Sequence, residues 1–168
     1  MEFQEVIRKR YSVRAYKPDD LPAEVIDKIL EAARIAPTAC NNQSFKLLVI
    51  KTASFKEELR KIYPQEWFVQ APYVIGICSI SQEGWVRRDG KNYAEVDAAI
   101  VMDHLILQAT DLGLGTCWVG AFNPEAAREF LDLPAEMEPL AFTPLGYPAD
   151  KPGIRRRKPM AELVQYIK

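Results

Sequence analysis

The feature that most constrains the fold is the stretch AEVDAAIVMDHLILQATDLG, residues 94–113, which predicts a long helix. A surface helix normally keeps one polar face toward solvent, whereas this stretch is apolar almost all the way round. Such a helix must be buried in the core of its own chain or against a partner. Gly113 and Gly115 follow it and are expected to end it.

Shorter elements flank this helix on both sides. Helices are predicted over residues 2–9, 22–36, 53–62 and 123–131, and strands over 45–51, 72–80, 116–122 and 139–148. Pro22 is expected in the first turn of its helix, and Asn123 is expected to cap the last one. The strand at 72–80 is nearly all apolar, which predicts burial on both faces, while 116–122 is a short strand or extended segment.

The length and composition favour one layered α+β domain over residues 1–168. The chain has 168 residues, of which 48% are hydrophobic, and that is enough for one core but not for two. Residues 81–93 are polar and contain two glycines, so they are predicted to form a loop with one exposed tryptophan, Trp85. Charges begin at Glu2 and the apolar runs are too short to cross a bilayer, so a cytoplasmic protein without a membrane partner is expected.

The charges are distributed unevenly along the chain. Residues 1–17 carry five Lys and Arg against two Glu, and residues 151–168 carry six against one. The 133 residues between them carry eleven against twenty Asp and Glu. Two solvated tails would explain this pattern, and so would two basic ends that converge on one multiply charged anion.

The side chains offer few catalysts of their own. His104 is the single histidine, and its place on the apolar helix favours a packing or interface role. Cys40, Cys78 and Cys117 are scattered, so neither a disulfide framework nor a zinc site is expected, and Cys40 and Cys117 are interpreted as structural. An enzyme with this inventory would need a cofactor to carry the chemistry, and the arginines favour a cofactor that bears a phosphate.

Four motifs in the right order resemble the FMN-dependent nitroreductase family. They are RKRYSVRAY (8–16), APTACNNQSF (36–45), GLGTCWVGAF (113–122) and LGYP (145–148) with the closing RRRKPMAELV (155–164). The resemblance covers nearly the whole chain. It implies a three-layer fold with a central, mostly antiparallel sheet flanked by helices. It also implies an intertwined homodimer with FMN at the subunit interface, which would bury the long helix.

The resemblance also assigns residues one by one. It implies that Arg10, Ser12 and Arg14 hold phosphate and ribityl oxygens, and that Arg155 and Arg157 close on the phosphate. A second stretch would touch the flavin from the other subunit; its matching residues are Pro37, Thr38, Ala39, Asn41 and Gln43. Residues 117–121, with Trp118, Val119 and Gly120, would lie along the flavin, with a backbone N–H near Gly120 approaching flavin N5.

Two departures from the family pattern concern the second stretch. Ala39 stands where serine is common, which removes one polar contact, and Ser44 stands where proline is common, which is expected to affect loop stiffness. Trp118 is a candidate packing residue as well as a cofactor contact. Trp85 is the candidate for a lid over the substrate.

The activity implied by the resemblance is ping-pong hydride transfer from NADH or NADPH to nitroaromatics, quinones or related conjugated electrophiles. No side chain is expected to act as an essential acid or base. A non-catalytic FMN carrier or sensor is the alternative, distinguished by a flavin that NAD(P)H does not reduce. A nucleic-acid surface is disfavoured because the body is acidic and no exposed aromatics alternate with the basic runs.

Overall fold

The structure is a computed structural model that describes residues 1–167. A four-stranded sheet forms the middle layer, in the order β1-β2-β4-β3, with every pair antiparallel. Its strands are β1 (Phe45–Lys51), β2 (Tyr73–Ile80), β3 (Gly115–Thr116) and β4 (Met137–Gly146). The helices are α1 (Phe3–Lys9), α2 (Ala23–Arg34), α3 (Lys56–Ile62), α4 (Ala94–Asp111), α5 (Pro124–Leu131) and α6 (Met160–Leu163).

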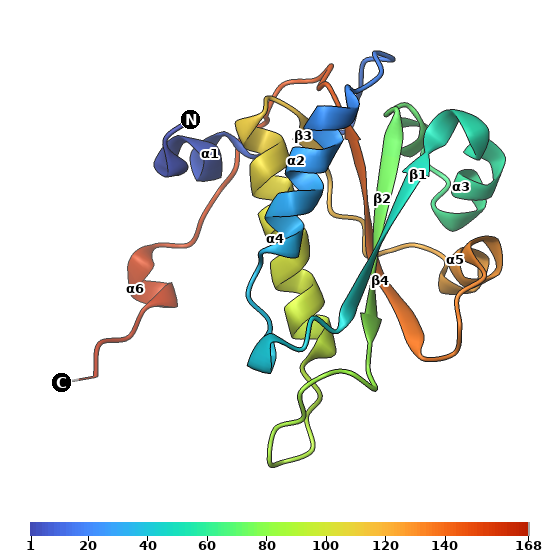
Figure 1. The fold of residues 1–168 in the computed structure, drawn as a ribbon. Helices are drawn as coiled ribbons and strands as arrows, with labels where there is room; N and C mark the ends of the chain where they lie inside the picture. The colour runs from blue at the N-terminus through green and yellow to red at the C-terminus, as the bar shows by residue number, and fades with distance from the viewer. Residues whose placement is uncertain (168) are drawn as a thin grey trace.

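Two helical layers cover the two faces of the sheet (Figure 1). On one face, α2 and α4 pack on Ile75, Ile77 and Leu145 in the larger apolar cluster. On the other face, α3 and α5 pack on Val74 and Phe142 in the smaller cluster. Alternate residues of β2 therefore enter different cores, which confirms the predicted burial of this strand on both faces. The predicted three-layer α+β fold is confirmed.

Helix α4 fills the centre of one layer but is not fully covered. The side facing the sheet and α2 carries buried Ala98, Val101 and Leu105. The opposite side leaves Val96 and Ile100 exposed to 39% and 36%. The predicted all-round burial is therefore only partly met within one chain.

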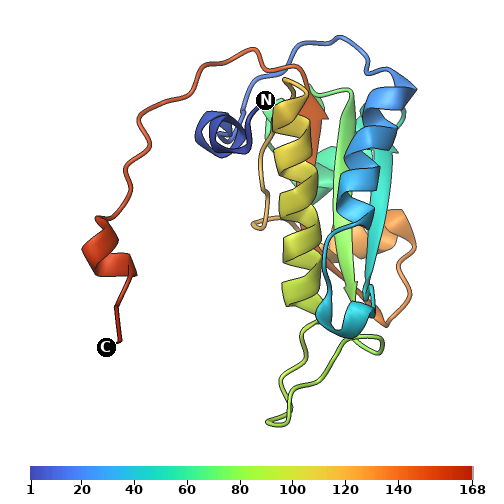
Figure 2. The ribbon, with the colours of Figure 1, turned by 60° about the vertical axis from the view of Figure 1, so that its left-hand side comes forward.

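The last segment of the chain leaves the body. Residues 151–167, hereafter the arm, are exposed throughout, and Figure 2 shows the arm running away from the layers with α6 on its outer part. Several of its apolar side chains are largely exposed: Ile154, Met160, Leu163, Tyr166 and Ile167. No helix within residues 1–167 is long and apolar enough to cross a membrane.

Several predicted boundaries were wrong by a few residues. Pro22 precedes α2 instead of lying in it, because its ψ of 142° is extended. The predicted helix 53–62 is a 3₁₀ turn at Thr52–Ser54 and then α3, because Phe55 between them has φ −142°. Asn123 does cap α5, as predicted, by accepting a 3.1 Å hydrogen bond from Ala126 N–H.

Residues 116–122, predicted as a short strand or extended segment, are mostly an extended segment beside β4. Only Gly115–Thr116 pair with β4 as a strand, and after them Val119 alone bridges to Phe142. The segment between these two points is bonded to β4 by the Thr143 side chain, which accepts from Cys117 N–H at 3.0 Å, so the regular ladder stops. β4 itself is shifted two residues toward the N-terminus relative to the predicted 139–148.

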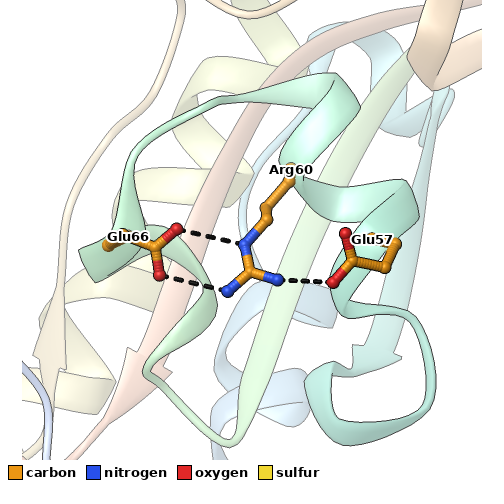
Figure 3. A network of polar contacts seen from close by, with 3 residues as sticks. All are labelled: Glu57, Arg60 and Glu66. Carbon is orange, nitrogen blue, oxygen red and sulfur yellow. Dashed lines mark hydrogen bonds and ion pairs between the residues drawn. The ribbon is translucent and has the colours of Figure 1, made fainter.

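A 3₁₀ turn that the sequence pattern did not predict, η3 (Glu66–Val69), is tied to α3 by an ion-pair network (Figure 3). Arg60 donates to both oxygens of Glu66 at 3.1 Å and to Glu57 at 2.5 Å. Arg60 lowers the pKa of the Glu66 carboxyl through this hydrogen bond and its charge. The pairing links η3, which carries Trp67, to α3.

Candidate functional site

The first predicted stretch, residues 10–14, is bonded to β3 by main-chain contacts. Val13 N–H donates to the Thr116 carbonyl at 2.9 Å, and Ser12 bridges to Thr116 in parallel. Gly115 is required here, because a Cβ at this position would lie 2.6 Å from Cγ2 of Val13. Val13 is buried, and the Tyr16 hydroxyl donates to its carbonyl at 2.9 Å. This backbone framework fixes the positions from which Arg10, Ser12 and Arg14 extend.

The two arginines of this stretch keep their charge unpaired. Among residues 1–167, neither Arg10 nor Arg14 forms an ion pair with a carboxylate. The Arg14 guanidinium lies 5.8 Å from the ring centroid of Trp67, a cation–π contact that orients it without neutralising it. Two arginines that flank Ser12 in the sequence, with no carboxylate partner within residues 1–167, are a donor set that suits a phosphate group.

Asp150 also lies at this stretch but binds the main chain and a phenol. Its carboxylate accepts from Arg14 N–H at 2.8 Å and from the Tyr11 hydroxyl at 3.0 Å. Burial and this carboxylate raise the pKa of Tyr11. Asp150 therefore anchors the start of the arm beside residues 11–14, a role that was not predicted from the sequence. The LGYP motif two residues before it was the available signal.

The two arm arginines differ in what they bind. Arg155 donates to the Arg10 carbonyl and, at 2.7 Å, to the Arg8 carbonyl, so it caps the C-terminal end of α1. Within residues 1–167, Arg157 donates only to the carbonyl of its neighbour Arg156, at 3.1 Å. The contact of Arg155 with Arg10 brings the arm next to the first stretch. The phosphate role predicted for Arg155 and Arg157 stays a prediction.

Cys117 directly follows Thr116, to which residues 12 and 13 are bonded. Burial raises the pKa of its thiol, while the nearby Arg14 and Arg10 oppose that rise. In residues 117–121 the buried Cys117 and Val119 alternate with the exposed Trp118 and Gly120. Trp118 is 42% exposed, so its packing role is not fulfilled within this chain. The cofactor contacts of Trp118, Val119 and Gly120 remain predictions.

The second predicted stretch, residues 37–43, is a tight turn after α2. Cys40, Asn41 and Gln43 have φ of 52°, 56° and 55°, which non-glycine residues rarely adopt. Two hydrogen bonds close the turn on Thr38: Gln43 N–H to Thr38 Oγ1 and Asn41 N–H to the Thr38 carbonyl, both at 3.0 Å. Pro37, Asn41 and Gln43 are exposed, and Thr38 and Ala39 are partly buried.

A buried carboxylate on α4 holds this turn in place. Asp97 is 2% exposed and accepts from Ala39 N–H at 2.9 Å and from the Ser44 hydroxyl at 3.3 Å. The role of Asp97 was not predicted from the sequence, although a carboxylate in the first turn of a mostly apolar helix was a signal. For Ser44 only an effect on loop stiffness was predicted, whereas Ser44 is fully buried and bonds to Asp97.

Trp85 is not fully exposed, contrary to expectation. Its ring lies edge-on to Tyr93 with 5.1 Å between centroids, and this contact half-buries it. The loop 81–93 adjoins the second stretch, because Asn42 Nδ2 donates to the Glu83 carbonyl at 2.9 Å. Trp85 therefore stands at the same end of the molecule as residues 37–43.

The two predicted stretches lie at opposite ends of α4 (Figure 1). Residues 10–14 adjoin Thr116, which follows the C-terminal end of α4, whereas residues 37–43 are bonded to Asp97 in its first turn. A helix of 18 residues is about 27 Å long. One chain therefore does not bring the two stretches to a common ligand.

The remaining candidates lie outside both stretches. His104 lines a groove of about 510 Å³ between α1, α2 and α4 that contains none of the predicted cofactor residues. Among residues 1–167, no group of His, Cys, Asp and Glu has the arrangement of a metal site.

Comparison with known proteins gives a consistent result. The model of the nitroreductase family matches residues 7–72 and 60–147. A relative from Methanothermobacter thermautotrophicus, provisionally named NADH dehydrogenase/NAD(P)H nitroreductase, is 32% identical over 92% of this chain and 82% of its own length. An NADPH-dependent oxidoreductase from Staphylococcus aureus is 27% identical over 86% of this chain, and the match spans 64% of that protein.

Solved structures agree in fold. A nitroreductase family protein from Clostridium difficile superposes with a TM-score of 0.91 at 37% identity, covering 100% of this chain and 99% of the other. Another, from Clostridium novyi, has a TM-score of 0.84 at 33% identity, covering 89% and 87%.

Proposed function

This chain belongs to the nitroreductase family and is an oxidoreductase, and we propose that it uses FMN and NAD(P)H to reduce nitroaromatics, quinones or related conjugated electrophiles. Bound FMN would supply the redox chemistry, accepting hydride from NAD(P)H and then reducing an acceptor that takes the same place in a ping-pong cycle. The protein chain itself must bind the cofactor, orient it and leave one face of the flavin open.

The observation that carries this proposal is the pair Arg10 and Arg14 beside Ser12. Both guanidiniums lack a carboxylate partner within residues 1–167, and the stretch is fixed to β3 by the Val13–Thr116 hydrogen bond. A phosphate monoester dianion would neutralise the two charges and accept from the Ser12 hydroxyl. Arg157 is available on the arm, which Arg155 holds against Arg10.

A second copy of the chain would complete the site. Residues 37–43 and residues 10–14 lie at opposite ends of α4, so they can act on one flavin only if they come from different chains. The exposed Val96 and Ile100 on α4 and the apolar side chains of the arm support the same arrangement, because two copies would bury them. We expect a dimer in sedimentation analysis; a monomer that binds FMN tightly would contradict this part of the proposal.

The main chain is proposed to tune the flavin. Within residues 1–167 the N–H of Gly120 has no hydrogen-bond partner in the protein, so it is free to donate to a ligand. A donor at flavin N5 would stabilise negative charge on the reduced ring system. Trp85 and Tyr93 would line the entry for the acceptor, since their loop adjoins residues 37–43.

No side chain is proposed as an essential acid or base. Burial raises the pKa of Cys78 to about 11 and also raises that of Cys117, so neither thiol is a nucleophile near neutral pH. Because no side chain is assigned such a role, we also expect Cys40→Ala and His104→Ala, loaded with FMN, to keep turnover within about twofold; loss of a true acid or base costs about 10²–10⁴-fold. A hundredfold loss in either variant with FMN retained would contradict the proposal.

The visible absorption spectrum of the purified protein tests the proposal most directly. Flavin bands that bleach anaerobically with NADH or NADPH are the expected result. Flavin bands that persist with both donors would favour a carrier or sensor instead. A protein that neither contains flavin nor takes up added FMN would disprove the cofactor assignment. The three cysteines are free, which fits the reducing cytoplasm that we propose as its location.

A further inference from the structure

The loop 81–93 is an ordered hairpin at the end of the molecule where α4 begins (Figures 1 and 2). Val86 and Asn92 pair in antiparallel fashion, and Arg87 N–H donates to the Lys91 carbonyl at 2.9 Å. Gly90 closes the turn by donating to the Arg87 carbonyl at 2.8 Å, with a φ of 87° that suits glycine. The hairpin therefore holds the residues of its turn, 87–91, in a defined arrangement.

The Arg87 side chain makes its polar contacts within the hairpin and stabilises it. Its guanidinium donates to both oxygens of Asp89, at 2.8 and 2.6 Å, and to the Tyr93 hydroxyl at 2.7 Å. It also lies 5.6 Å from the centroid of the Tyr93 ring, which packs on Trp85. The charge of Arg87 is thus balanced by Asp89.

Two further cations of the hairpin have no such balance. Among the described residues, Arg88 and Lys91 form no ion pair with a carboxylate. Lys91 Nζ lies 5.8 Å from the Tyr93 ring, so this one ring carries two cations, of which Asp89 balances one. Arg88 is exposed in the turn next to them. Residues 81–93 carry three Lys and Arg against two carboxylates, Glu83 and Asp89, so the hairpin has a small net positive charge.

The hairpin stands out against an acidic body. Residues 18–150 carry eleven Lys and Arg against twenty Asp and Glu, and three of those eleven lie in this hairpin. Positive charge that can attract an anionic ligand is therefore found in two regions: the basic segments around Arg10 and Arg14, and this hairpin. The hydrogen bond from Asn42 to Glu83 puts the hairpin beside residues 37–43, which are proposed to touch the flavin.

We propose that the hairpin binds the 2′-phosphate of NADPH through Arg88 and Lys91, and that the enzyme therefore prefers NADPH to NADH. The inference rests on the proposed function, because it requires a hydride donor at the flavin. The phosphate of FMN is assigned to Arg10, Ser12 and Arg14. NADPH brings another phosphate monoester that NADH lacks, and the positive charges of Arg88 and Lys91 match it.

The ratio of kcat/KM for NADPH to kcat/KM for NADH tests this assignment. We expect Arg88→Ala/Lys91→Ala to lower the NADPH value about tenfold and the NADH value far less, because only NADPH loses two charge-assisted contacts. The matched control is Lys28→Ala/Lys61→Ala, which removes two exposed cations without a carboxylate partner in residues 1–167 from α2 and α3. This control should leave the ratio unchanged.

Three results would overturn the assignment. They are a wild-type enzyme without preference for NADPH, a variant that loses both donors equally, and a control that changes the ratio as much as the variant. An equal loss of both donors would assign the hairpin to the pyrophosphate that they share. An enzyme that oxidises neither donor would instead disprove the proposed function.

A binding measurement keeps the inference testable without turnover. Adenosine 2′,5′-bisphosphate should bind the FMN-loaded wild-type protein more tightly than adenosine 5′-monophosphate does, and Arg88→Ala/Lys91→Ala should abolish that difference. The difference should also shrink with added salt, because the contact is exposed. Equal binding of the two nucleotides to the wild type would contradict the 2′-phosphate site.

Discussion

At the C-terminal end of α4, residues 10–14 are fixed by main-chain bonds to β3, and their charged side chains have no carboxylate partners among residues 1–167. At the N-terminal end of α4, residues 37–43 are fixed by the side chain of Asp97, and it is their main chain that adopts unusual positive φ angles. One end thus presents side chains on a regular backbone. The other presents an irregular backbone that is held by a side chain.

The difference teaches which substitutions each end tolerates. Where the backbone is the support, removal of a side chain should change ligand binding and leave stability nearly intact. Where a buried side chain is the support, its removal should change stability first, because a strained turn and unpaired polar groups remain.

The largest effect on FMN affinity is expected at residues 10–14, at the C-terminal end of α4. Arg10→Ala/Arg14→Ala should weaken FMN binding about 100-fold or more, because each charge-assisted contact to phosphate contributes about 1.5–3 kcal/mol. Fluorescence titration of the apoprotein with FMN measures this, with thermal unfolding of the apoprotein in parallel. Arg8→Ala/Lys9→Ala is the control, since these two exposed cations are not assigned to the cofactor. An equal loss of affinity in the control would mean that only overall charge matters.

At residues 37–43, at the N-terminal end of α4, a smaller loss of FMN affinity is expected, together with a loss of stability. Asp97→Ala leaves Ala39 N–H and the Ser44 hydroxyl without their buried acceptor, which should lower the free energy of unfolding by about 1–3 kcal/mol. FMN affinity should fall about tenfold as the turn loosens. Urea unfolding and FMN titration measure the two effects.

Asp97→Asn separates support from charge at this position. The amide oxygen can still accept from Ala39 N–H, so this variant should recover most of the stability and most of the FMN affinity. If Asp97→Asn and Asp97→Ala behave alike, the hydrogen bonds to the turn are not what Asp97 contributes.

The sequence predicted this molecule best where the pattern is local. The long helix, the buried strand and the Asn123 cap depend on residues within a few positions of one another, and all three are present. The support of residues 37–43 depends on Asp97, which is 58 positions from Ala39 in the chain. No periodicity within a window can reveal such a contact, so Asp97 was missed and Ser44 was underestimated.

Contacts between chains limit the prediction further. Val96 and Ile100 on α4 and several apolar side chains of the basic arm are of the kind that is usually buried, yet within one chain they are exposed. Hydrophobic patterning records that a residue is buried but not by which chain. Trp118 is a further example. A large aromatic side chain is usually packed in a core, but Trp118 is 42% exposed in this chain.

The smallest effect on stability and FMN affinity is expected from substitution of Arg60, which contacts residues 10–14 only indirectly. Arg60 binds Glu66 of η3, and η3 carries Trp67, on which Arg14 stacks. The ion pair is exposed and screened, so Arg60→Ala should change the melting temperature by no more than about 3 °C and FMN affinity by about twofold at most. Arg34→Ala is the matched control, because it breaks an exposed pair with Glu31 that lies away from Trp67.

The pH dependence identifies the Arg60 contribution. Because Arg60 lowers the pKa of Glu66, the ion pair stabilises the fold above the ordinary glutamate value of 4.5 and is lost as the pH falls through the lower folded value. The difference in melting temperature between wild type and Arg60→Ala should therefore be present at pH 7 and close as the pH is lowered toward 3. A difference that persists unchanged would assign the effect to packing of the Arg60 side chain. If Arg60→Ala alters FMN affinity no more than Arg34→Ala does, Trp67 is positioned by its apolar contacts in the smaller core and not by the ion pair.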